Sequence, residues 1–164
     1  MIVVSNSTPL ISLAKIDRFD LLKAIFSKVH ISQGVYEEVV VEGEGLAGAR
    51  EVSDADWIEI VEVSDKSAVE ELKGELDKGE SEVIVLAREL GADWLLLDER
   101  LARQKAKALR FKVIGTLGIL LRAKEMRLIE TVKPEMDQLR AQGIRISRRV
   151  YEQVLSIAQE GDEL

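Results

Sequence analysis

The sequence contains no cysteine, which excludes a disulfide framework, a thiolate zinc site and a cysteine nucleophile, and which is consistent with a reducing cytosol. No apolar run approaches the ~18 residues that a membrane-spanning helix requires. The start of the chain, residues 1–6, has neither the charged leader nor the apolar core of a signal peptide. We therefore expect a soluble, cytoplasmic protein.

Aromatic residues make up only 4% of the chain, which disfavours a single-stranded nucleic-acid binder that relies on stacked bases. His30 is the only histidine and lies in an apolar run, so we interpret it as a packed strand residue and not as a ligand or base. No Gly-x-Gly-x-x-Gly motif follows the first apolar run, and the P-loop motif Gly-x-x-x-x-Gly-Lys-Ser/Thr is absent. A Rossmann-type cofactor enzyme is therefore disfavoured.

The net charge of -7 conceals an uneven distribution, because residues 99–149 carry 14 Lys or Arg and five Asp or Glu. The negative net charge of the chain argues against nonspecific nucleic-acid binding. The basic segment 99–149 supplies phosphate contacts if its cations lie on one face. Arg100, Arg103 and Lys107 fall on one side of an expected helix and are candidate RNA contacts. The alternatives are a solvated helix face and a surface for an acidic partner.

Short apolar runs alternate with segments of helical spacing, which is typical of βαβ units and a parallel sheet. The expected strands are residues 2–4, 29–31, 57–61, 94–97 and 113–114, and the expected helices include 80–90, capped by Gly91, and 100–110. The strand at 57–61 has the weakest placement in the sheet.

The length of 164 residues fits a single domain, 1–164, in which 134–164 form a helical C-terminal extension. One apolar set is interpreted as core packing, with a homodimer surface as the alternative: Ile119, Leu120, Ile129, Val132 and Met136.

Polar residues follow the apolar runs at the positions where a parallel sheet forms its binding crevice, beyond the carboxyl ends of its strands. Asn6 follows the first strand and Asp98 follows the strand at 94–97. Glu80 lies in the first turn of the helix before that strand, and Glu38 lies on the helix after the second strand. These four residues are our candidate site.

Acids that converge repel one another unless a cation compensates them, and hard oxygen ligands favour Mg²⁺ or Mn²⁺. Glu37 is a less favoured neighbour of Glu38, and Glu82 is the rival of Glu80. A structural alternative stays open: Asp98 caps the helix that follows it, and Glu80 is an ordinary first-turn acid.

Five stretches in order along the chain resemble the PIN domains, and most closely a prokaryotic PIN-like branch that opens with Ser-Asn-Ser/Thr-Ser/Thr-Pro-Leu. The stretches are Ser5-Asn6-Ser7-Thr8-Pro9-Leu10-Ile11, Val35-Tyr36-Glu37-Glu38-Val39, residues 79–87 (GESEVIVLA), Leu95-Leu96-Leu97-Asp98, and residues 115–121 (GTLGILL). They cover nearly the whole chain.

The resemblance implies a three-layer α/β/α fold with a central parallel sheet. It also implies a metal-dependent ribonuclease, often the toxin of a toxin–antitoxin pair, so RNA and an antitoxin protein are the implied partners. Glu38, Glu80 and Asp98 match the second, third and fourth acidic positions of the family. These three residues are therefore the implied carboxylate ligands of the metal.

Asn6 stands where the family usually has an aspartate. An amide oxygen ligates a divalent ion but brings no negative charge, so we expect weaker metal binding than in the usual PIN site. The leading hypothesis is a metal-dependent endoribonuclease with Asn6 as a neutral fourth ligand. The alternative is a degenerate PIN fold that binds RNA or a partner protein without cleaving it.

Overall fold

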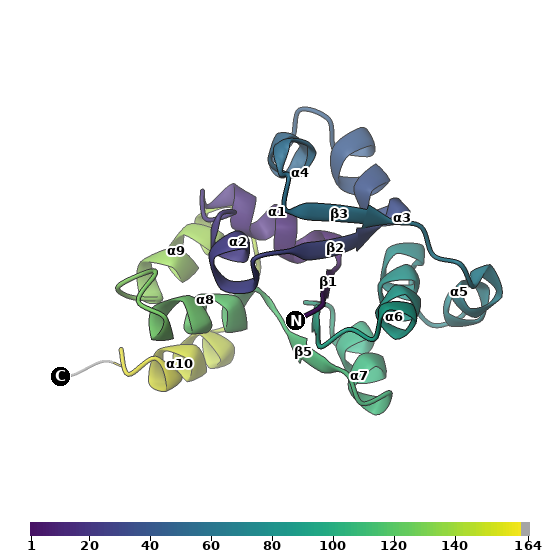
Figure 1. Ribbon diagram of the computed structural model, residues 1–164. Helices are drawn as coiled ribbons and strands as arrows, with labels where there is room; N and C mark the ends of the chain where they lie inside the picture. Colours follow the sequence, from purple (N-terminus) through teal and green to yellow (C-terminus); the bar gives the residue numbers. More distant parts are fainter. Residues whose placement is uncertain (162–164) are drawn as a thin grey trace.

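A computed structural model describes residues 1–161 as strands and helices that alternate around one sheet (Figure 1). The strands are β1 (Val3–Ser5), β2 (Val29–Ser32), β3 (Ile58–Val61), β4 (Trp94–Leu96) and β5 (Lys112–Ile114). The helices are α1 (Ser7–Lys15), α2 (Leu21–Phe26), α3 (Gln33–Tyr36), the π-helix η1 (Glu37–Glu42), α4 (Ala49–Asp54), α5 (Lys66–Leu72), α6 (Lys78–Leu90), α7 (Arg100–Ala108), α8 (Thr116–Glu125), α9 (Lys133–Ala141) and α10 (Arg148–Ile157).

The sheet is parallel throughout, with the strand order β3-β2-β1-β4-β5. The chain runs from β1 outward through β2 to β3 and then returns to β4 on the other side of β1. This reversal opens a crevice between the carboxyl ends of β1 and β4, which is where ligands bind in open parallel sheets. In register, Ser5 pairs with Leu96. The strand at 57–61, which had the weakest placement in the sequence, is the edge strand β3.

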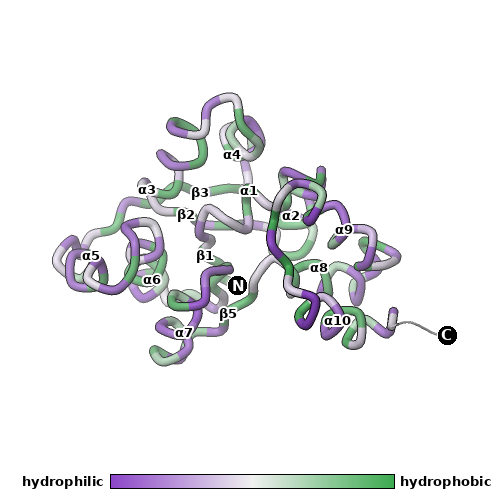
Figure 2. Tube along the Cα trace, turned by 180° about the vertical axis from the view of Figure 1, so that it is seen from behind, coloured by the Kyte–Doolittle hydropathy of each residue, from purple (hydrophilic) through white to green (hydrophobic). Residues whose placement is uncertain are grey.

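Two layers of helices cover the sheet. On one side α6 contacts β1, β2 and β4 and packs against α5 and α7; on the other, α8 contacts α1, α2 and α10. Figures 1 and 2 both show α5, α6 and α7 on the opposite side of the molecule from α8, α9 and α10. In Figure 2 hydrophilic and hydrophobic residues alternate along the helices, as expected of helices with one buried face. The three-layer α/β/α prediction is confirmed.

The core lies where the two helical layers meet the sheet. Val3, Val4, Leu95 and Leu96 are fully buried, because strands of a parallel sheet are covered on both faces. The apolar set at Ile119, Leu120, Ile129, Val132 and Met136 is also buried. The core interpretation of that set is confirmed, and these side chains do not form a homodimer surface. No helix within residues 1–161 has the length and apolar character needed to cross a bilayer.

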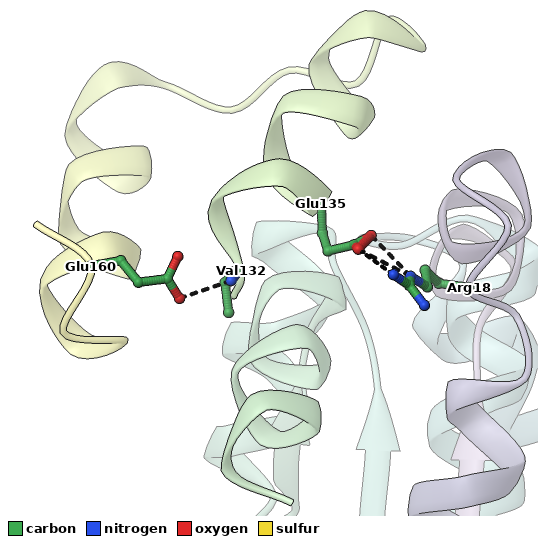
Figure 3. A network of polar contacts seen from close by, with 4 residues as sticks. All are labelled: Arg18, Val132, Glu135 and Glu160. Carbon is green, nitrogen blue, oxygen red and sulfur yellow. Dashed lines mark hydrogen bonds and ion pairs between the residues drawn. The ribbon is translucent and has the colours of Figure 1, made fainter. Parts of the chain in front are cut away.

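Two carboxylates tie the C-terminal helices to the rest of the chain (Figure 3). Glu135 on α9 accepts hydrogen bonds of 3.0 and 2.7 Å from the Arg18 guanidinium, between α1 and α2. Glu160, after α10, accepts from the backbone N–H groups of Val132 at 2.8 Å and Lys133 at 3.0 Å, where α9 begins. Residues 133–160 are therefore held by polar contacts as well as by apolar packing.

Candidate functional site

Asn6 leaves β1 at the reversal point of the sheet. Its backbone N–H donates to the carbonyl of Leu96 on β4 at 3.0 Å, which fixes it between the two strands. Asn6 is also the N-cap residue of α1, yet its side chain makes no capping hydrogen bond. The residue is only 7% exposed.

The first turn of α6 carries a reciprocal capping box between Asp77 and Glu80. Asp77 Oδ1 accepts from the Glu80 N–H at 2.8 Å, and Glu80 Oε1 accepts from the Asp77 N–H at 3.1 Å. Burial raises the pKa of Glu80, and the charges of Asp77 and Glu99 raise it further, against the opposing effect of the Asp77 N–H. Glu80 thus lies in a buried environment that has an excess of negative charge, which a cation would relieve.

Gly79, between these two acids, faces a small space lined by oxygen atoms. A methyl group on Gly79 would lie 3.4 to 3.6 Å from three of them: Oδ1 of Asn6, Oε1 of Glu38 and Oδ1 of Asp77. The three oxygens come from β1, η1 and the start of α6. Of the four residues of the candidate site, the oxygens near Gly79 include those of Asn6 and Glu38, and Asp77 lies beside them.

The donor set around Gly79 fits a hard divalent cation. It consists of one amide and two carboxylate oxygens, and Mg²⁺ keeps several waters to complete its six ligands. Across residues 1–161 no three Asp, Glu, His or Cys side chains lie close enough to form a metal-binding group by themselves. Asn6 supplies the third oxygen of this group, and it is the neutral one.

Asp98 lies on a different wall of the crevice. Its two oxygens accept from Thr116 at the start of α8, Oδ1 from the backbone N–H at 2.7 Å and Oδ2 from the hydroxyl at 2.6 Å. Gly115 leaves room for this contact, since a Cβ there would lie 2.7 Å from Asp98 Oδ1. The N-cap of α7 is Glu99, not Asp98: Glu99 Oε2 accepts a hydrogen bond from the Ala102 N–H. The structural alternative in which Asp98 caps the following helix is therefore wrong.

The basic helix α7 begins next to this crevice. Arg103 Nη1 donates to the Leu97 carbonyl at 2.9 Å, so its guanidinium is fixed at the carboxyl end of β4. Arg100 and Lys107 are exposed on the same helix. Of these three cations, Arg103 is the one that a hydrogen bond among the described residues holds at the crevice.

The remaining acids have other roles. Glu82 accepts from the Gly34 N–H at 3.0 Å and joins α6 to α3, and Glu37 is exposed on η1. Sequence reasoning missed Asp77 and Thr116. The pattern Asp77-x-x-Glu80 is the sequence signature of a capping box and would have indicated Asp77. The Thr116 contact spans 18 residues and has no local signal.

A family model described as a PIN domain matches residues 2–160. The chain belongs to the PIN-domain family. PIN domains are generally dependent on divalent metals and commonly act on nucleic acids. No protein among the curated ones matches the chain. The resemblance found in the sequence is thereby confirmed for the family, and the roles of its individual residues stay predictions.

Proposed function

We propose that this PIN domain is a divalent-metal-dependent endoribonuclease. The observation that carries the proposal is the gathering of the Asn6, Glu38 and Asp77 oxygens around Gly79, in the crevice where the strand order reverses. Oxygen ligands of this kind select Mg²⁺ or Mn²⁺. A bound ion would activate water for attack on an RNA phosphodiester and would stabilise the developing charge.

The proposed ligands are Glu38, Glu80 and Asp98, with Asn6 as the neutral member and Asp77 as an addition from the structure. Glu80 contributes negative charge from a buried position, and Asp98 is held in place by Thr116. Arg100, Arg103 and Lys107 on α7 are proposed to contact the RNA backbone. Their positive charge attracts phosphate to a region whose acids would otherwise repel it.

The test is cleavage of a labelled, unstructured RNA in Mn²⁺, in Mg²⁺ and in chelator. We expect metal-dependent cutting that Glu38→Gln and Asp98→Asn each reduce by about 100-fold or more, because even outer-shell partners of metal ligands contribute 10- to 100-fold. Glu37→Gln is the matched control, since it removes one exposed acid beside Glu38. Asn6→Asp should strengthen metal binding. Cutting that survives in chelator would contradict the proposal.

A second candidate function is a non-cleaving PIN fold that binds RNA or a protein. Two observations favour it: Asn6 supplies no charge, and both oxygens of Asp98 already accept hydrogen bonds. RNA binding without cutting by the native protein, together with cutting by Asn6→Asp, would select this function.

A toxin role, an antitoxin partner and a cytoplasmic location belong to the same proposal. The ground for them is the resemblance to PIN domains, which are often the toxins of toxin–antitoxin pairs. Copurification of a small protein that suppresses the cutting is the expected result. Cutting that persists when that protein is bound would contradict the toxin role.

A further inference from the structure

A cavity of about 440 Å³ lies on the α8 side of the crevice, beside Asp98. Its volume falls within the range of small-ligand sites, ~300–1,000 Å³. The polar part of its lining includes Asp98 and Glu99 together with the hydroxyl-bearing residues Thr8, Ser12 and Thr116. Of the proposed metal ligands only Asp98 lines this cavity, and the oxygens around Gly79 lie outside it.

The apolar part of the lining comes from α8, α9 and the segment that joins α9 to α10. Leu117, Leu139, Ile144 and Ile146 form it, and Arg145 lies between the last two with its side chain exposed. The cavity therefore has aliphatic walls, a polar part rich in hydrogen-bond acceptors, and one cation. A second cavity, of about 720 Å³, shares Leu117, Ile144, Arg145 and Ile146 with the first, so this connector takes part in both.

This lining matches one nucleotide of a single-stranded RNA. A base edge that carries an amino group donates hydrogen bonds, which carboxylates accept. The aliphatic side chains cover the faces of the base, and the exposed guanidinium of Arg145 suits a phosphate at the rim. A phosphate inside the cavity would face two carboxylates, so the base enters and the phosphate stays outside.

We propose that the cavity beside Asp98 binds one amino-bearing base of an RNA strand, with Glu99 accepting from the base and Arg145 contacting a flanking phosphate. The inference rests on the proposed function in taking RNA as the ligand, and it adds a base preference to it. Adenine, cytosine and guanine carry the amino group and uracil does not. Placing the base next to Asp98 brings the adjoining phosphodiester toward the crevice.

The experiment measures binding of labelled pentanucleotides of adenylate, cytidylate and uridylate by fluorescence anisotropy, in chelator so that none is cut. We expect the native protein to bind the adenylate and cytidylate strands about fivefold more tightly than the uridylate strand. The glutamine of Glu99→Gln still has an oxygen that accepts from the Ala102 N–H, but its side chain is neutral and carries an NH₂ group that donates. It should reduce that preference to less than about twofold.

Arg145→Glu should weaken the binding of all three RNA pentanucleotides equally, by about tenfold. Arg149→Glu is the matched control, because it makes the same charge change at an exposed arginine that lines neither cavity, and its effect should be clearly smaller. Equal effects of the two variants, or the absence of a base preference, would overturn the inference, and so would an unchanged preference in Glu99→Gln. A protein segment as the true occupant would leave RNA affinity unaffected by Arg145→Glu and would overturn it too.

The two proposals fail separately. The base preference measured in chelator reports the cavity, and metal-dependent cutting reports the Gly79 site. If the protein shows the base preference but does not cut RNA, the cavity proposal stands and the nuclease proposal fails. If it cuts RNA without the preference, the nuclease proposal stands and the cavity proposal fails.

Discussion

Gly79 offers a direct test of the space between Asn6, Glu38 and Asp77. A methyl group fits there, because 3.4 to 3.6 Å are ordinary contact distances, yet it would occupy the volume that a cation needs. We expect Gly79→Ala to leave the free energy of unfolding unchanged, or to raise it by up to about 1 kcal/mol, since alanine favours helix more than glycine does.

The same substitution should abolish the stabilisation that Mn²⁺ gives the native protein in thermal unfolding, because ligands stabilise the folded state that binds them. Gly74→Ala, at an exposed position with no neighbour closer than 3.6 Å, is the control and should keep the Mn²⁺ effect. A Gly79→Ala protein that still responds to Mn²⁺ would place the metal elsewhere.

The sequence predicted that Asn6, Glu38 and Asp98 lie at one crevice, but it did not predict the face of the sheet to which the Asp98 side chain points. Ser5 pairs with Leu96, so Asn6 is level with Leu97 and Asp98 lies one step further along. Successive side chains of a strand point to opposite faces. Asn6 therefore faces the α6 layer and Asp98 faces α8, a difference that depends on strand register, which the pattern of apolar runs does not determine.

At the scale of elements, the alternation of apolar runs and helical spacing predicted every strand of the described sheet and the Gly91 cap of α6, whose φ of 62° is left-handed. It did not predict the π-helix η1. A π turn contains one residue more than an α turn, so spacing rules for α-helices fail across it, and such turns are frequent at functional sites. Glu38 lies on this segment.

Glu160, which accepts hydrogen bonds at the start of α9, predicts how the free energy of unfolding depends on pH. Burial works to raise the pKa of Glu160, but hydrogen bonds from Lys124 and from the N–H groups of Val132 and Lys133 outweigh it, and the pKa lies below its ordinary value of 4.5. A carboxyl whose pKa is lower in the folded state stabilises the fold above the unfolded pKa. That contribution is lost as the pH falls through the folded value.

We therefore expect Glu160→Gln to lower the free energy of unfolding at pH 7 by about 1.5 to 3 kcal/mol, the range for hydrogen bonds to charged groups. The difference from the native protein should shrink steadily below about pH 4.5. Urea unfolding at a series of pH values measures it. Glu152→Gln removes an exposed ion pair with Arg148 on α10 and should change stability by less than about 1 kcal/mol at any pH. A deficit in Glu160→Gln that does not change with pH would contradict the assignment.

At the scale of the whole molecule, the question is whether residues 134–164 belong to the same domain as the sheet. The helices of this region bury Met136, Leu139, Val154 and Leu155 in the common core. Each buried side chain of this size contributes about 1.5 to 3 kcal/mol. Their sum is comparable to the ~5–15 kcal/mol net stability of a typical domain.

A chain that ends before Lys133 should therefore fail to unfold in a cooperative transition. It would expose Ile129 and Val132 and would leave Arg18 without Glu135. Circular dichroism during heating measures this, and a chain that ends after Gly161 is the control, since it keeps every contact described. If the shortened chain melts cooperatively at the native temperature, the C-terminal helices form a separate unit. In that case the cavity that Leu139, Ile144 and Ile146 help to line would be an interface between two units and not part of one domain.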